Sequence, residues 1–96
     1  MQFLIYAEDK ADSLDIRKAN RDAHLAFLKA GDGAQVLVAG PWLDEEGVMR
    51  GSMLIVESES RENVETWLSH DPYAKAGLTE KVIIRHYKWV IGAPAA

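Results

Sequence analysis

The order in which strand-like and helix-like segments follow one another constrains the fold of this chain more than any other feature. Short apolar runs rich in β-branched and aromatic residues are typical of buried strands. Longer segments whose apolar residues recur every three or four positions are typical of helices. We predict strands at residues 2–8, 34–39, 49–57 and 81–90, a long helix at about 12–30, a second helix after Ser60 and a short turn of helix at 73–77.

The predicted order is therefore β-α-β-β-α-β. This is the order of the ferredoxin-like unit, an α+β fold in which an antiparallel sheet carries both helices on one face. The other face of the sheet then lacks a cover. The chain has only 96 residues, and a domain of this size buries only about 60% of the surface that its unfolded chain exposes. We therefore expect a second copy to cover the open face, which makes a homodimer.

Glycine, proline and small polar residues mark the ends of these segments. Gly31 and Gly33 suit the end of the long helix, and Ser60 suits the N-cap of the second. Asp71 followed by proline suits the start of a third helical turn. The pair Gly40-Pro41 is expected to end regular strand pairing, because proline has no amide hydrogen to donate.

Two sets of side chains compete for the buried face of the long helix. Arg17, Arg21, His24 and Leu28 share one side by helical spacing. The side chains that lie on the adjoining face are the better core candidates by composition, namely Ile16, Ala23 and Phe27. His24 is then expected at the border between core and polar surface.

Composition and charge exclude several classes of function. The formal net charge of −4 argues against a nucleic-acid partner, whose phosphates need clustered Lys and Arg. Apolar runs are strand-sized, which predicts no membrane span, and the start of the chain lacks the basic and apolar regions of a signal peptide. The chain has no cysteine, which fits a reducing cytoplasm. We expect a single domain at 1–91 with a tail at 92–96.

His24 and Asp71 are the candidate acid–base residues. An imidazole with an ordinary pKa of about 6.5 can take and give protons at cellular pH, and a carboxylate can hold it in one tautomer. Each residue also has a structural interpretation. His24 can be a border histidine bonded to a carbonyl, and Asp71 can be a plain N-cap. His70 is a rival partner for Asp71, and His86 suits a structural or interface position.

Several short motifs together resemble the YciI-like (YCII-related) family over nearly the full chain. They are 21–28 (RDAHLAFL), 39–41 (AGP), 51–52 (GS), 71–73 (DPY) and 76–78 (AGL). The resemblance implies a dimeric α+β barrel with a pocket in which a histidine and an aspartate form an acid–base pair, here His24 and Asp71. Among similar proteins are a dehydrochlorinase that acts on a chlorinated hydroxyquinol and, more distantly, the muconolactone isomerases. Trp42 departs from the family pattern, which has a smaller aliphatic residue there.

The remaining candidates are substrate-binding residues, and each again has an alternative. Ser52 can donate a hydrogen bond to a substrate oxygen or serve only as a small residue in the sheet. Gly40 and Pro41 can shape the backbone only, or exposed amides in their segment can bind an anionic oxygen. Trp42 and Tyr73 can stack on an aromatic ligand. Arg21, like Arg17, can attract an anionic substrate or lie on a solvated helix face.

We therefore predict a small lyase or isomerase whose His24–Asp71 pair moves a proton on an aromatic or enolisable small molecule. The alternative is a non-catalytic module that binds a small ligand in the same pocket. A third reading is an interaction domain that works through its open sheet face. No metal site is predicted, because the three histidines lack a recognised ligand spacing, and no cofactor is required by any motif in the chain.

Overall fold

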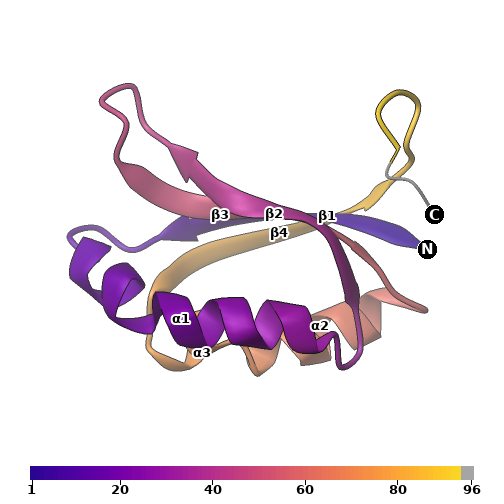
Figure 1. Cartoon of the computed structure of the whole chain (residues 1–96), viewed down its shortest axis with the longest axis horizontal. Helices are drawn as coiled ribbons and strands as arrows, with labels where there is room; N and C mark the ends of the chain where they lie inside the picture. Colours follow the sequence, from indigo (N-terminus) through magenta and orange to yellow (C-terminus); the bar gives the residue numbers. More distant parts are fainter. Residues whose placement is uncertain (94–96) are drawn as a thin grey trace.

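The chain forms one antiparallel sheet with its helices gathered on a single face (Figure 1). The structure is a computed structural model that describes residues 1–93. The expected tail at 92–96 therefore falls largely outside the described residues. The elements in chain order are β1 (Gln2–Asp9), α1 (Leu14–Ala30), β2 (Gln35–Leu43), β3 (Met49–Glu57), α2 (Arg61–Ser69), α3 (Pro72–Lys75) and β4 (Thr79–Tyr87).

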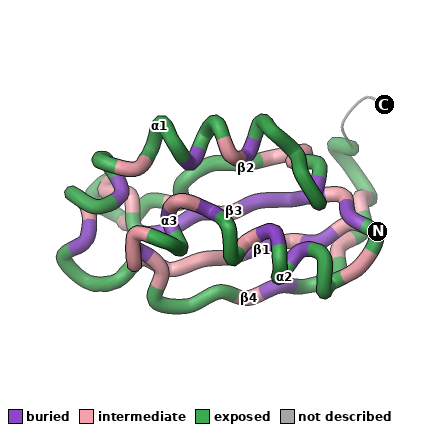
Figure 2. Tube along the Cα trace, turned by 90° about the horizontal axis from the view of Figure 1, so that it is seen from below, coloured by how far each residue is buried: buried purple, intermediate pink, exposed green. Residues whose placement is uncertain are grey.

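The strand order β2-β3-β1-β4 confirms the predicted ferredoxin-like α+β fold. β1 lies between β3 and β4 and pairs antiparallel with both. Ile5 stands opposite Leu54 on one side and Ile84 on the other, so these three side chains point to the same face. Figure 2 shows β3, in the interior of the sheet, as the most continuously buried strand.

The core lies between this sheet face and the helices. Alternate positions on the strands supply one half of it, and the helices supply the other half at helical spacing. Trp67 is buried in this core, as the sequence predicts. The buried apolar residues that form this core cluster are Phe3, Ile5, Leu28, Ala34, Leu54, Val56, Val64, Trp67 and Ile84.

The face that the long helix turns to the core is only partly the one predicted. Arg17, His24 and Leu28 are buried, whereas Ile16 is exposed and Ala23 is exposed as well. Phe27 is half-buried and packs against the core, as predicted. The prediction is wrong for Ile16 and Ala23. Arg17 and His24 are accommodated under the helix because each finds a polar partner there.

Strand β2 runs through Gly40-Pro41 and continues to Leu43, which corrects the prediction that pairing ends at this proline. Pro41 stands opposite Ser52 in the β2–β3 ladder. Because β2 is at the edge of the sheet, it has only one paired side, and an edge strand tolerates the missing amide hydrogen. The fourth strand is shorter than predicted and ends at Tyr87 rather than at residue 90.

The helix caps follow the sequence closely. The Ser60 hydroxyl accepts a hydrogen bond from the Asn63 amide at 3.1 Å, and Asp71 caps the turn that begins with Pro72. The long helix ends at Gly31 in the left-handed conformation, with φ of 67°. The caps fix where α1, α2 and α3 begin or end, and Asp71 in particular is held next to α1.

The face of the sheet that the helices leave open carries a mixture of half-buried apolar and charged side chains. Leu4 and Tyr6 on β1 lie there beside Met53 and Ile55 on β3. Such a face gains stability if a second copy covers it. The homodimer stays a prediction, since the structure contains one chain.

Candidate functional site

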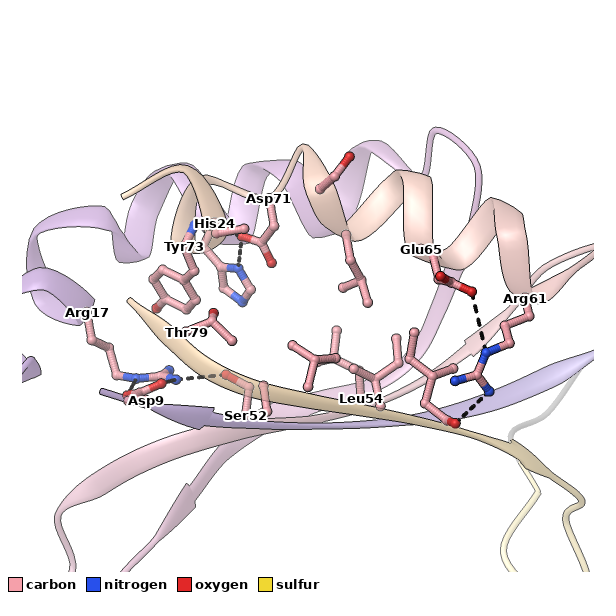
Figure 3. Close-up of a pocket in the computed structure, with 17 residues that line it drawn as sticks. Asp9, Arg17, His24, Ser52, Leu54, Arg61, Glu65, Asp71, Tyr73 and Thr79 are labelled. Atoms are coloured by element: carbon pink, nitrogen blue, oxygen red, sulfur yellow. Dashed lines mark hydrogen bonds and ion pairs between the residues drawn. The ribbon is translucent and has the colours of Figure 1, made fainter. Parts of the chain in front are cut away.

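A cavity of about 480 Å³ lies between the sheet and the helices α1, α2 and α3. Figure 3 shows that polar side chains gather at one end, where β1, α1 and α3 meet. The sheet contributes a largely apolar floor through Ile5, Leu54 and Ile84. A concave, mainly apolar site with a few convergent polar groups is the usual form of a small-molecule site.

His24 and Asp71 meet at the polar end of this cavity. The Nδ1 atom of His24 lies 2.8 Å from Oδ1 of Asp71, although the residues are 47 positions apart in the chain. Both are only 7% exposed. An ionised carboxylate only accepts hydrogen bonds, so Nδ1 carries the hydrogen and the neutral ring leaves Nε2 as an acceptor. Figure 3 shows Nε2 directed into the cavity.

The same carboxylate oxygen also caps α3. Asp71 Oδ1 accepts the backbone N–H of Tyr73 at 2.9 Å as well as the His24 hydrogen. Capping and contact with His24 are therefore compatible, and a single oxygen serves both. This arrangement ties the position of the histidine ring to the start of α3.

Tyr73 packs flat against the His24 ring. The ring centres are 3.8 Å apart and the planes differ by 12°. Burial raises the pKa of Tyr73 and the Asp71 charge adds to this, although the nearby Arg17 cation opposes both. The phenol therefore stays protonated at neutral pH and remains a hydrogen-bond donor at the polar end of the cavity.

A buried ion pair forms the other wall of this end. Arg17, 3% exposed, donates from Nε to Asp9 Oδ2 at 2.7 Å and from Nη2 to Asp9 Oδ1 at 2.9 Å. Nη2 also donates to the Ser52 hydroxyl oxygen at 2.8 Å. Burial works against the charge of Arg17, but the hydrogen bonds and charge of Asp9 outweigh it, so the pKa of Arg17 is raised.

The sequence analysis did not identify Asp9 as a site residue. It left Arg17 with two possible roles, attraction of an anionic substrate or a place on a solvated helix face. One signal was present. Arg17, His24 and Leu28 follow one another at helical spacings of seven and four residues, which places an arginine in line with a buried leucine. An arginine in that position needs an acidic partner. Asp9, which directly follows the first predicted strand, is one of several carboxylates upstream in sequence, so the spacing alone does not select it.

Comparison with known proteins identifies the family of the chain. The model of the YCII-related domain matches residues 1–88. The chain belongs to the YCII-related family. It is 41% identical to Protein YciI of Escherichia coli O6:H1, over 94% of this chain and 99% of that protein. It is 34% identical to an uncharacterized protein of Haemophilus influenzae, with the same coverage of both chains.

A solved structure of known activity is also similar. It is 5-chloro-2-hydroxyhydroquinone dehydrochlorinase from Burkholderia phenoliruptrix AC1100, in complex with 2,5-dihydroxybenzoquinone. The sequence identity is 40% and the TM-score is 0.79, with 92% of this chain and 94% of that chain covered. The two chains therefore share the same fold.

The candidate binding residues of this YCII-related chain fall on both faces of the sheet. Arg21, Gly40 and Pro41 line a smaller cavity of about 150 Å³, which shares His24 and Ser52 with the larger one. The His24 ring thus stands between two hollows, one toward β4 and α2 and one toward β2. Tyr73 lines both cavities as well.

Trp42 lines neither of these two cavities, contrary to expectation. It stands opposite Gly51 on the open face of the sheet and stacks on Tyr6, with ring centres 5.5 Å apart. Its Nε1 donates to the Ala7 carbonyl at 2.8 Å. The cause is a bulge in β2 between Val36 and Val38, because one extra residue moves every following side chain to the other face.

The other two histidines lie away from the dyad. His70 is exposed and its Nδ1 lies 2.9 Å from the Thr66 carbonyl oxygen, so the rival pairing with Asp71 does not form. His86 is exposed on β4 and packs against Phe3. Within residues 1–93, no group of three or more His, Asp or Glu side chains is placed to hold a metal ion. No helix among these residues is long and apolar enough to cross a membrane.

Proposed function

We propose that this protein is a small-molecule lyase or isomerase in which His24 moves a proton. The observation that carries the proposal is the hydrogen bond of 2.8 Å between His24 Nδ1 and Asp71 Oδ1, which leaves Nε2 facing the larger cavity (Figure 3). A base that is held in one tautomer and directed at a substrate pocket can contribute about 10²–10⁴-fold to a proton-transfer rate.

The proposed reaction starts when Nε2 removes a proton from an enolisable or phenolic substrate. The ring then carries a positive charge, which the Asp71 carboxylate stabilises through Nδ1–H. In a lyase, the electron pair left behind moves through the substrate and expels an anionic leaving group, so that an acid is lost overall. In an isomerase, the imidazolium returns the proton to a different atom of the same substrate.

Ser52, Arg17 and Tyr73 would bind the substrate oxygen on which charge develops. The Ser52 hydroxyl accepts a hydrogen bond from Arg17, so its own hydrogen is free to point into the cavity. The raised pKa of Tyr73 keeps a second donor available. Donors that are fixed before the reaction stabilise such an oxygen without reorganising. The smaller cavity, with Arg21, Gly40 and Pro41, would take the leaving group or a ring substituent.

An aromatic substrate fits the walls of the cavity. Its floor is apolar and the Tyr73 ring lies against one side. The similar dehydrochlorinase binds 2,5-dihydroxybenzoquinone, a small oxygenated ring. At 40% identity over 92% of this chain, we propose a substrate of the same chemical type, with the leaving group open to test.

The homodimer and the cytoplasmic location belong to the same proposal. A second copy would cover the half-buried apolar side chains of the open sheet face, such as Leu4 and Tyr6. A chain without cysteine fits a reducing compartment. The protein mass in solution tests the first point, and a monomer at all concentrations would contradict it.

The proposal is tested with 5-chloro-2-hydroxyhydroquinone as substrate and chloride release as the readout. Wild-type protein should release chloride faster than buffer alone, and His24→Gln should reduce the rate by at least ~100-fold while keeping the fold. His70→Gln is the matched control, because His70 is exposed and does not line the cavity. Full activity in His24→Gln would overturn the mechanism. Saturable binding without chloride release would favour the non-catalytic module instead.

A further inference from the structure

The larger cavity has a second polar end that the proposed reaction does not use. From the His24–Asp71 end it extends past Leu54, Leu68 and Ile84 to Arg61 and Glu65 on α2. Figure 3 shows these two charged side chains on the opposite side of the cavity from His24 and Tyr73. A substrate that consists of a single ring at His24 leaves this far end empty.

The Arg61 guanidinium is held at the far end, but not all of its hydrogen-bond donors have a partner there. Its Nη1 donates to the Ile84 carbonyl at 2.8 Å, which fixes it over β4. Its contact with Glu65 joins Nε and Oε1 at 3.4 Å, between side chains that are 50% and 56% exposed. An ion pair this exposed contributes little. Within residues 1–93 Nη2 has no hydrogen-bond partner.

The sheet register gives the distance between the two polar ends. Ser52 stands opposite Ala7, whereas Ile84, the residue that anchors Arg61, stands opposite Ile5. The two ends are therefore two residues apart along the strands and two strands apart across the sheet. With about 3.4 Å per residue and about 4.8 Å between strands, the separation is roughly 12 Å.

We propose that Arg61 is a specificity-determining residue that binds a carboxylate on the substrate. This inference rests on the proposed function, because it places the reacting ring at His24. The substrate class is then an aromatic or enolisable head, a short apolar linker along Leu54 and Leu68, and a terminal carboxylate. Nη2 and the second hydrogen of Nη1 present the paired donors that a carboxylate accepts.

Glu65 has the opposite charge to Arg61, so it distinguishes a carboxylate site from the alternative, a site for a cationic group. If the far end served a cationic group, Glu65 would be its ligand and Arg61 would repel it. If it serves a carboxylate, removing the Glu65 charge should leave binding intact or strengthen it. Neutral substitutions of Arg61 and Glu65 should therefore change the affinity for a given probe in opposite directions.

The test is binding of phenols of increasing length, followed by NMR on the amide signals. The probes are phenol, 4-hydroxybenzoate, 3-(4-hydroxyphenyl)propanoate and 4-(4-hydroxyphenyl)butanoate, each acid with its uncharged amide. Signals around His24 and Tyr73 report the ring, and signals of α2 report the tail. We expect the two longer acids to bind wild type roughly tenfold more tightly than their amides.

The variants complete the design. Arg61→Gln should remove the difference between acid and amide, Arg61→Lys should keep part of it, and Glu65→Gln should keep or enlarge it. Arg50→Gln is the matched control, since Arg50 is also an exposed arginine in an ion pair but lies outside the cavity. Thermal unfolding of each variant checks that the fold is kept.

Three results would overturn the assignment of Arg61. They are equal binding of acids and amides, no effect of Arg61→Gln, or a loss of acid binding in Glu65→Gln. If phenol shifts the His24 signals but the acids bind no more tightly than their amides, the inference fails and the proposed function stands. If no probe binds near His24 at all, both fail together.

Discussion

The two faces of the central sheet differ in the kind of contacts they make, although adjacent residues of one strand supply both. Gly51 and Ser52 are neighbours on β3, yet Gly51 lies under the Trp42 indole on the open face and Ser52 bonds to Arg17 on the helix face. The open face is built from ring stacking, as between Tyr6 and Trp42. The helix face instead contains buried charges and hydroxyls around a cavity. The pleat of a strand lets one segment serve both purposes.

The comparison teaches where polar groups indicate chemistry. On the open face the charged side chains are exposed or half-buried, as at Arg85, Glu8 and Glu57, so contact with water accounts for them. On the helix face, Arg17, His24 and Asp71 are each at most 7% exposed. Burying such groups is unfavourable unless they are paired. A chain that needed only stability could fill this space with apolar side chains, so the buried polar cluster supports a functional role for this face.

The largest expected effect comes from breaking the buried ion pair of the helix face. Arg17→Gln leaves the Asp9 carboxylate buried without its cation, which should lower the free energy of unfolding by about 3–5 kcal/mol. The exposed pair of Arg50 with Asp44, also at 2.9 Å, is the control. Arg50→Gln should leave stability nearly unchanged, because water and salt screen an exposed pair. Urea denaturation measures both, and equal losses would remove the distinction between the faces.

The next effect concerns close packing on the open face. A Cβ atom at Gly51 would clash with the Trp42 indole and with the Ala7 carbonyl oxygen. Gly51→Ala should therefore destabilise the fold by about 1–3 kcal/mol, because the indole and the strands must move apart. Thermal unfolding measures the loss. A fully stable Gly51→Ala protein would show that Trp42 is not held where the structure places it.

The smallest effect separates Trp42 from the cavity. Trp42→Phe keeps a ring over Gly51 but loses the hydrogen bond from Nε1 to the Ala7 carbonyl, which should lower stability by about 1 kcal/mol. If the wild-type protein binds 2,5-dihydroxybenzoquinone as proposed, titration should show the same affinity in Trp42→Phe. A clear loss of binding would return Trp42 to the substrate site and contradict the assignment of the two faces.

The fold could be predicted from the sequence because local signals agreed with one another. Strand alternation, the Ser60 cap and the Asp71-Pro72 start each indicated the same order of elements, and the order identifies the topology. What local signals could not give was the sheet register. The bulge between Val36 and Val38 depends on pairing with β3, and it alone decides that Trp42 faces away from the cavity.

The candidate site could be predicted only in part, for a related reason. Helical spacing places His24 on the same side as Leu28, but nothing local brings Asp71 next to it, and the pairing was expected from the family resemblance. Asp9 and Arg17 come from a strand end and a helix start. Their contact depends on how α1 packs on the sheet, and an arginine on a helix is usually solvated.

The most direct test of the central claim is the tautomer of His24, read from the nitrogen-15 chemical shifts of its ring at neutral pH. Replacement by His24→Gln assigns its signals among the three histidines. The account predicts hydrogen on Nδ1 and none on Nε2, and it predicts that Asp71→Ala abolishes this preference. Hydrogen on Nε2 in the wild-type protein would contradict it, because that nitrogen could then not accept a proton from a substrate in the cavity.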